Sequence, residues 1–370
     1  MLKPLIAFRN KKGDLSIIFL TIIIAVFGIL MVYSSSSYYA LTVYKNQYYF
    51  VKKQVVGFLI GLVFMAFTAN FNFYSLFKIK YILLGVGIVL LLLVFTPLGV
   101  ENYGARRWIN LGGFTVQPSE IAKFCYIIFI AGYFGKNPEK VKTFKGIILP
   151  LLFGGVICVL IMVEPNMSIT MCVGMLMIAM LFASGVKIKS LLIICVPILI
   201  LVPILIIAEP YRLKRLFAFI NPWASPKGEG YQLLQSLYAL GSGGWFGVGL
   251  FRSRQKYRFL PFAESDFILS VIGEELGFVG TVIMFLVMLL LCYRGYKVAI
   301  KSKNFYTYLL AVGIITIFTI QIAINALVVT GSIPPTGLPL PLISSGNTSL
   351  IVFMSAFGLL YNISKEVEKI

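Results

Sequence analysis

The sequence predicts an all-α, polytopic membrane protein of about ten transmembrane helices with one large extracytoplasmic loop. Its 370 residues are 59% hydrophobic, which exceeds the roughly 45–50% typical of soluble domains, and the mean hydropathy is +0.94. The apolar residues form long runs, and a run of about 20 can cross the hydrocarbon core as a helix. These runs show no strict alternation, so helices rather than barrel strands satisfy the backbone in lipid.

The apolar runs divide the chain into spans within one predicted domain, residues 1–370. The spans lie near residues 15–34, 51–70, 79–96, 117–134, 147–163, 167–185, 189–208, 267–293, 307–330 and 347–363. We do not expect the first run to be a cleaved signal peptide, because it is long and further spans follow it. Residues 209–266 form the one predicted extramembrane segment large enough to build a site, and long loops of this kind are often functional.

Basic residues predict the orientation of the chain. With the N-terminus inside, the short loops on the inner side are consistently rich in lysine and arginine, as the positive-inside rule requires. We therefore expect a multi-pass membrane protein with both termini in the cytoplasm. The basic residues on the outer side concentrate in residues 104–123 and 209–266. They could contact anionic lipid headgroups or form an extracytoplasmic site for a phosphate-bearing ligand, and charge alone favours neither.

Several kinds of chemistry are excluded by composition. The chain has no histidine, which excludes a Ser-His-Asp triad and histidine metal ligands. Its five cysteines lie in apolar runs without paired spacing, so we expect core residues rather than disulfides or a metal site. The net charge of +19 does not indicate nucleic-acid binding, because no domain of soluble size is present.

The segment 252–277 contains the strongest candidate for acid–base chemistry. Asp266 stands where the basic loop meets an apolar helix, and it could be a helix N-cap, a general base, or both. The helix dipole would favour its ionised form. Glu274 and Glu275 follow at a depth where carboxylates usually have buried partners, and we favour a structural or coupling role for them.

The segment 104–123 contains a second group of charged residues. Glu120 and Lys123 are three residues apart on a predicted helix and therefore share one face. They could form an intrahelical ion pair, or Lys123 could face a phosphate near Arg106 and Arg107.

Two further segments fall on the same predicted face. Residues 334–349 contain four prolines, which forbid a continuous helix and predict a re-entrant or surface segment. Asn325, just before this segment, is predicted to form an interhelical hydrogen bond. Glu164 ends the fifth span, where it could serve the site or cap the loop. The convergence of all four segments on the outer face is stronger support than any one of them.

These segments resemble the SEDS family of FtsW, RodA and SpoVE along nearly the whole chain. The specific matches are RRWI…QPSE…K at 106–123, LP…DFI…GEELG at 260–277 and PTG…LP.ISSG at 335–346. The stretch SRQK at 253–256 favours the FtsW/SpoVE branch over RodA.

The chain departs from the family pattern in two places. Asn166 and Ser168 stand where members often carry Asp and Gly, which puts a catalytic use of position 166 in doubt. Ser345 and Asn347 replace the Tyr and Gly of a common ISYGGS stretch. A turn remains compatible there, since Asn tolerates the left-handed conformation.

The resemblance implies a peptidoglycan glycosyltransferase that polymerises lipid II, the undecaprenyl-pyrophosphate-linked disaccharide peptide, in division, elongation or sporulation. Asp266 matches the family's essential carboxylate and would act as the catalytic base in an inverting transfer to the acceptor 4-hydroxyl. The expected substrate-binding residues are Arg106, Arg107, Glu120, Lys123, Arg254, Lys256 and Ser344.

The resemblance also suggests partners and leaves two alternatives open. The expected partners are a class B penicillin-binding protein transpeptidase and other divisome or sporulation membrane proteins. A divalent cation, Mg²⁺ or Mn²⁺, is compatible with the chemistry, although no ligand set is recognisable in the sequence. The alternatives are a lipid II flippase and a non-catalytic scaffold, neither of which needs a base on the outer face.

Overall fold

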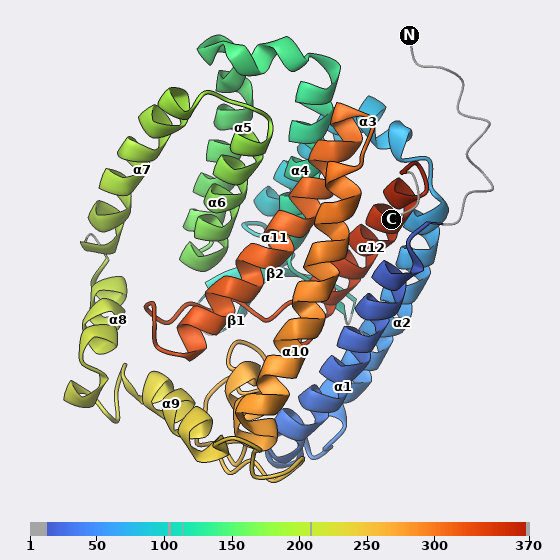
Figure 1. Ribbon diagram of the computed structural model, residues 1–370. Helices are drawn as coiled ribbons and strands as arrows, with labels where there is room; N and C mark the ends of the chain where they lie inside the picture. Colours follow the sequence, from blue (N-terminus) through green and yellow to red (C-terminus); the bar gives the residue numbers. More distant parts are fainter. Residues whose placement is uncertain (1–12, 103–104, 113, 208, 368–370) are drawn as a thin grey trace.

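The computed structural model describes residues 13–102, 105–112, 114–207 and 209–367, and it confirms the all-α, polytopic prediction (Figure 1). Every predicted span coincides with a helix. These helices are α1 (Leu15–Tyr44), α2 (Tyr49–Asn70), α3 (Phe73–Leu93), α4 (Pro118–Lys136), α5 (Phe144–Val163), α6 (Met167–Ala183), α7 (Ile188–Ile207), α10 (Ile268–Ile300), α11 (Phe305–Val329) and α12 (Asn347–Ser364).

Length and composition support a multi-pass membrane protein. Within the described residues, seven of the helices are long and apolar enough to cross a membrane. The other three predicted spans are α4, which carries buried charged residues, α6, which has 17 residues, and α7, which contains two prolines.

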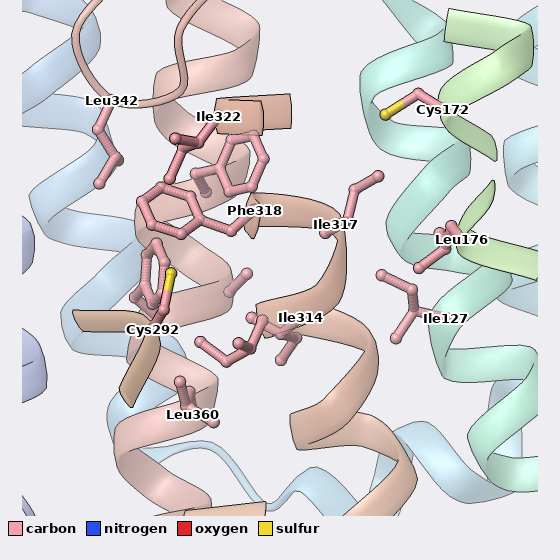
Figure 2. Close-up of a cluster of buried hydrophobic side chains, with 14 of the residues drawn as sticks. Ile127, Cys172, Leu176, Cys292, Ile314, Ile317, Phe318, Ile322, Leu342 and Leu360 are labelled. Atoms are coloured by element: carbon pink, nitrogen blue, oxygen red, sulfur yellow. The ribbon is translucent and has the colours of Figure 1, made fainter. Parts of the chain in front are cut away.

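The core lies around α11, which is buried over 72% of its most apolar window. Figure 2 shows side chains of α11 between Ile127 and Leu176 on one side and Cys292 and Leu360 on the other. These four residues come from α4, α6, α10 and α12, so α11 packs against four neighbours at once. The five cysteines are free; three of them are buried, as expected of core residues, and Cys158 and Cys195 are partly buried.

Close helix packing depends on glycine where α12 meets α2. A Cβ at Gly61 would lie 2.5 Å from Sδ of Met354, and one at Gly358 would lie 2.3 Å from the backbone oxygen of Met65. A larger residue at Gly358 would therefore force the helices apart, whereas at Gly61 the Met354 side chain would have to move; small residues are common where membrane helices approach closely.

A small antiparallel sheet between α3 and α4 was not predicted. It consists of β1 (Gly99–Asn102), β2 (Ala105–Leu111) and β3 (Phe114–Val116), paired in the order β1-β2-β3. The sequence signal was weak because the strands are short. Each strand is stabilised by pairing with its neighbour rather than by a strong local residue pattern.

The large loop, residues 209–266, contains more regular structure than its glycine and proline content suggested. It includes α8 (Pro210–Ile220), a 3₁₀ turn at Pro222–Ala224 and α9 (Tyr231–Gly243). A further 3₁₀ helix, Pro138–Lys142, precedes α5. We call the end of the bundle that carries α9 and residues 244–266 the loop end; it lies at the bottom of Figure 1.

The first and last long helices meet at the opposite end. The backbone N–H of Asp14 donates to Oγ of Ser364 at 2.8 Å, and Asp14 pairs with Arg294 at 3.6 Å. Asp14 also accepts a hydrogen bond from the N–H of Ser16 and thereby caps α1. The two aspartates of the chain therefore lie at opposite ends of the bundle.

Candidate active site at the loop end

Asp266 lies at the junction of the large loop and α10, but it does not cap the helix. The N-cap position is Phe267, and no side chain accepts a hydrogen bond there. The alternative reading of Asp266 as an N-cap is therefore wrong, because the helix begins one residue later than the cap would require. The partly buried carboxylate of Asp266 remains available for other chemistry.

Asn325 fixes the backbone on both sides of the site. Its Nδ2 donates to the backbone oxygen of Asp266 at 2.8 Å and to that of Leu338 at 2.7 Å. Asn325 thus forms hydrogen bonds as predicted, but the prediction of an interhelical bond is wrong, because both acceptors lie outside the helices. The same amide joins α11 to the large loop and to the proline-rich segment 334–346, which is non-helical as predicted.

Ser344 also holds the backbone near Asp266. Its hydroxyl donates to the backbone oxygen of Ser265 at 2.6 Å and accepts from the N–H of Leu340 at 2.8 Å. The side chain is only 5% exposed, and both hydrogen bonds go to backbone. The structure thus gives Ser344 a positioning role, and direct contact with substrate stays a prediction.

Gly337 makes room for the Asp266 carboxylate. A Cβ at this position would lie 2.9 Å from Oδ2 of Asp266. The N–H of Gly337 donates to Oγ of Ser168 at 3.2 Å, so one of the residues that departs from the family pattern anchors this segment. The proline-rich segment therefore passes directly beside the carboxylate.

The surroundings of Asp266 keep its pKa close to neutrality. Burial and, to a smaller extent, the neighbouring Glu264 raise the pKa, Arg107 and Arg215 lower it, and the net result is a pKa of about 6. A carboxylate with such a pKa is mostly ionised at pH 7 but still accepts a proton readily, as a general base should.

The strand β2 separates the two arginines that were predicted to act together. Adjacent residues on a strand point to opposite faces. Arg106 pairs with Glu101 at 3.5 Å, and its side chain is 54% exposed. Arg107 turns inward, where Nε donates to the backbone oxygen of Glu164 at 3.3 Å and Nη2 contacts the backbone oxygen of Pro165. Of this pair, only Arg107 is among the charges that act on Asp266.

Two charged residues near the site were absent from the predicted set. Arg215, on α8, donates to the backbone oxygen of Pro335 at 3.4 Å and acts electrostatically on Asp266. Glu164 is 1% exposed, and burial raises its pKa to about 8 although Arg107 lowers it. The sequence had indicated Glu164 only as a residue that could serve the site or cap the loop, and nothing local distinguished Arg215 from the other basic residues of the large loop.

The predicted ion pair on α4 is present and deeply buried. Nζ of Lys123 lies 2.8 Å from Oε1 of Glu120, and the two side chains are 0% and 1% exposed. The ammonium also lies 6.0 Å from the ring centre of Phe353 on α12. The shared helix face is confirmed, and the contact of either residue with substrate stays a prediction.

Glu275 has the structural role predicted for it. Its carboxylate accepts hydrogen bonds from Oγ of Ser34 at 2.6 and 2.7 Å and from the N–H of Ser253 at 3.1 Å. Lys256 completes this group at 3.5 Å from Glu275, and it is 6% exposed. Lys256 is therefore buried in a structural pair, and its predicted contact with substrate remains untested.

Glu274 holds the next part of the same loop. It accepts hydrogen bonds from the N–H of Arg254 at 2.9 Å, from the N–H of Gln255 at 3.4 Å and from the hydroxyl of Ser253. The side chain of Arg254 points to the exposed surface. Within the described part of the chain, no three acidic or cysteine side chains gather as metal ligands, so the divalent cation stays a prediction.

The fold and the site define a class: a polytopic helical membrane protein with a partly buried carboxylate and inward-facing arginines at one end of its bundle. The chain belongs to the FtsW/RodA/SpoVE family, whose model, described as "Cell cycle protein", matches residues 14–369. The predicted family membership is confirmed.

Relatives match nearly the full chain. Stage V sporulation protein E of Bacillus subtilis (strain 168) is 36% identical over 362 residues, which cover 96% of this chain and 98% of that protein. A probable peptidoglycan glycosyltransferase FtsW of Geobacter sp. (strain M18) is 38% identical over 360 residues, covering 96% of this chain and 98% of that one.

Solved structures share the fold. A chain from a peptidoglycan synthase complex that coordinates polymerization and crosslinking superposes with a TM-score of 0.79 and 27% identity, covering 95% of this chain and 97% of that chain. The rod shape determining protein RodA of Thermus thermophilus has a TM-score of 0.71 and 25% identity, covering 96% and 98% of the respective chains.

Proposed function

We propose that this protein is a peptidoglycan glycosyltransferase that polymerises lipid II at the outer face of the bacterial cytoplasmic membrane. The proposal rests on the surroundings of Asp266. Its pKa of about 6 suits a general base, and the positive charges of Arg107 and Arg215 act on its carboxylate. The FtsW relatives of similar length, which are named as probable peptidoglycan glycosyltransferases, support the same activity.

The chemistry requires one displacement with inversion. The donor sugar is α-linked to a diphosphate lipid and the product is β-1,4-linked. Asp266 accepts the proton of the acceptor 4-hydroxyl as that oxygen attacks the anomeric carbon, and the carbon–oxygen bond to the diphosphate breaks with its electron pair leaving on the phosphate. Positioned proton transfer of this kind contributes about 10²–10⁴-fold.

The leaving diphosphate needs neutralisation of its charge rather than a proton. Arg107 and Arg215 are suited to this, because guanidinium groups bind phosphate oxygens in a bidentate way. Their anchoring to the backbone oxygens of Glu164 and Pro335 holds them in place before the reaction, and such preorganisation strengthens electrostatic stabilisation.

We further propose that a class B penicillin-binding protein is the partner of this chain in division or sporulation. The structural relative from a peptidoglycan synthase complex, in which polymerization and crosslinking are coordinated, supports such an assembly. In this arrangement both termini face the cytoplasm and Asp266 faces the outside.

The test is polymerisation of lipid II by the purified protein together with its transpeptidase partner. We expect glycan strands from the wild type and none from Asp266→Asn or Asp266→Ala. Asp14→Asn is the matched control, because it removes the other aspartate, at the far end of the bundle, and it should still polymerise.

The outcomes also separate the alternatives. Polymer from the Asp266 variants at the wild-type rate would refute the base assignment. A flippase would instead be indicated by two results together: the wild type transports lipid II but makes no polymer, and Asp266→Asn still transports lipid II. Complementation of a deletion strain by Asp266→Asn at normal expression would indicate a scaffold.

A further inference from the structure

A second basic site lies at the loop end, apart from the surroundings of Asp266. A cleft of about 590 Å³ opens between α9 and the beginning of α10. Its lining includes Tyr238, Ser242, Arg252, Arg254, Gln255 and Glu274. Two arginines from one short loop thus face one concave surface.

The two arginines have no competing carboxylate. Among the described residues, no ion pair or side-chain hydrogen bond involves the guanidinium of Arg252 or Arg254, and both residues are exposed. Glu274 is 2% exposed, and its oxygens already accept hydrogen bonds from the loop backbone and from Ser253. Over the part of the chain that the structure describes, the cleft therefore has two guanidinium groups without an ion-pair partner, and the carboxylate in its lining already accepts hydrogen bonds.

A buried acceptor in the cleft also lacks a partner. Oε1 of Gln255 is buried and has no hydrogen-bond partner among the described residues. A buried polar atom without a partner is costly, and a bound ligand with hydroxyl or amide groups would satisfy it. Arginine pairs with a nearby amide are well suited to a phosphate carried on a polar sugar.

The chain between two residues that line the cleft, Ser242 and Val248, suits contact with lipid. Trp245 and Phe246, in the turn after α9, are 68% and 82% exposed. Large aromatic side chains gather at the membrane–water interface, where a lipid chain and its headgroup meet. A ligand with a phosphate head and a hydrocarbon chain therefore fits the cleft better than a free anion.

The proposed reaction requires a second lipid-linked diphosphate. Donor and acceptor each carry one, and only the donor diphosphate lies at the bond that breaks. The acceptor diphosphate lies two sugar rings away from the attacking hydroxyl. Glu274, in the wall of the cleft, lies six residues beyond Ile268, where α10 begins just after Asp266, which corresponds to roughly 9 Å of helix, a separation of the same order as a disaccharide.

We propose that the Arg252–Arg254 cleft binds the diphosphate of the acceptor lipid while Asp266 receives the proton of its 4-hydroxyl. This inference rests on the proposed function and adds to it the location of the second substrate. It assigns Arg254 to the acceptor and leaves Arg107 and Arg215 for the leaving diphosphate of the donor.

The test measures how many lipid II molecules bind to a variant that cannot polymerise them. In an Asp266→Asn background, native mass spectrometry is expected to find two lipid II molecules per protein. Adding Arg252→Gln and Arg254→Gln should weaken the second binding event by about tenfold or more, as expected for lost charge-assisted hydrogen bonds. The matched control is Lys227→Gln with Arg258→Gln, which removes two exposed charges from the same loop but outside the cleft, and it should still bind two.

Further arms make each result decisive. Arg252→Lys with Arg254→Lys keeps the charge and should retain much of the second binding, which excludes misfolding as the cause of a loss. An unchanged second affinity in the glutamine variant would overturn the proposal. Phosphatidylglycerol that fills the cleft and resists displacement by lipid II would also overturn it, by assigning the cleft to an anionic phospholipid.

Failure of the proposed function would look different. In that case the wild type makes no polymer, whatever the number of lipid II molecules bound. If the wild type is active, Arg252→Gln with Arg254→Gln should lower the rate at subsaturating lipid II by about tenfold, and more lipid II should recover much of it.

Discussion

At the scale of single residues, the properties of Asp266 come from what surrounds it. The pKa of an aspartate in water is about 3.9. Burial and Glu264 raise the pKa of Asp266 to about 6. Arg107 and Arg215 limit this rise. The carboxylate thus has a pKa near the working pH, where a general base combines ionisation with affinity for a proton.

This environment predicts the pH dependence of polymerisation. The base works ionised, so the rate should fall as the pH decreases through about 6 and should level off above it. Arg107 lowers the pKa of Asp266, so Arg107→Gln should move the midpoint to higher pH. The measurement is the initial rate of polymerisation between pH 5 and 8, at saturating lipid II.

The neighbouring residue provides the control for this experiment. Arg106→Gln removes the same charge one position away, from a side chain that faces outward and pairs with Glu101. Its midpoint should match that of the wild type. A midpoint that stays unchanged in Arg107→Gln, or shifts equally in both variants, would contradict the assignment of Asp266 as the titrating base.

At the scale of secondary structure, α4 shows how a helix can carry two charges into the core. Glu120 and Lys123 share a face because they are three residues apart, and each neutralises the other at 2.8 Å. Removing one partner leaves an uncompensated buried charge, which costs about 3–5 kcal/mol. Replacing both by neutral residues avoids that cost.

A double-mutant cycle therefore separates structure from substrate binding. We expect Lys123→Met alone to lower the melting temperature strongly and Glu120→Gln with Lys123→Met to restore much of it. Polymerisation should stay lost in the double variant, because Lys123 is also predicted to contact phosphate. Recovery of both stability and activity in the double variant would reduce the pair to a structural role.

A matched pair at the surface calibrates the cycle. Glu139 and Lys142 have the same spacing and the same 2.8 Å separation, but their side chains are 80% and 67% exposed. Exposed pairs contribute only about 0–1 kcal/mol. The corresponding substitutions at these positions should leave both the melting temperature and the activity nearly unchanged.

At the scale of the whole molecule, long-range contacts bring separate segments to one end of the bundle. Asn325 joins α11 to Asp266 and to Leu338, and Glu275 joins α1 to the loop at Ser253. The loop end is therefore built from segments more than two hundred residues apart in the chain. Its position relative to the membrane follows from the basic loops, which predict that it faces outward.

Thiol labelling tests this orientation. Lys227→Cys places a thiol on the exposed part of the large loop, and Lys142→Cys places one at the opposite side of the predicted topology. A membrane-impermeant reagent should label position 227 in intact cells and position 142 only after permeabilisation. The unsubstituted protein, whose five cysteines are buried or partly buried, measures the background. Labelling in the reverse pattern would undo the proposed mechanism.

The sequence by itself determined the class of fold and the position of every long helix. Transmembrane spans depend on composition within about 20 neighbouring residues, so α1 to α7 and α10 to α12 could be predicted without knowledge of their partners. The absence of histidine and the candidate role of Asp266 as a base could likewise be read from the sequence alone. The three motifs that carry the family resemblance are also local in the chain.

Only the tertiary structure decided which charges meet. Arg106 and Arg107 are equivalent in the sequence, but the pleat of β2 turns them to opposite faces. Arg215 and Glu164 gain their importance from neighbours far along the chain, and Lys256 is taken into a pair with Glu275. Electrostatic interactions depend on distance in space and on burial, and neither quantity can be obtained from the spacing of residues along the chain.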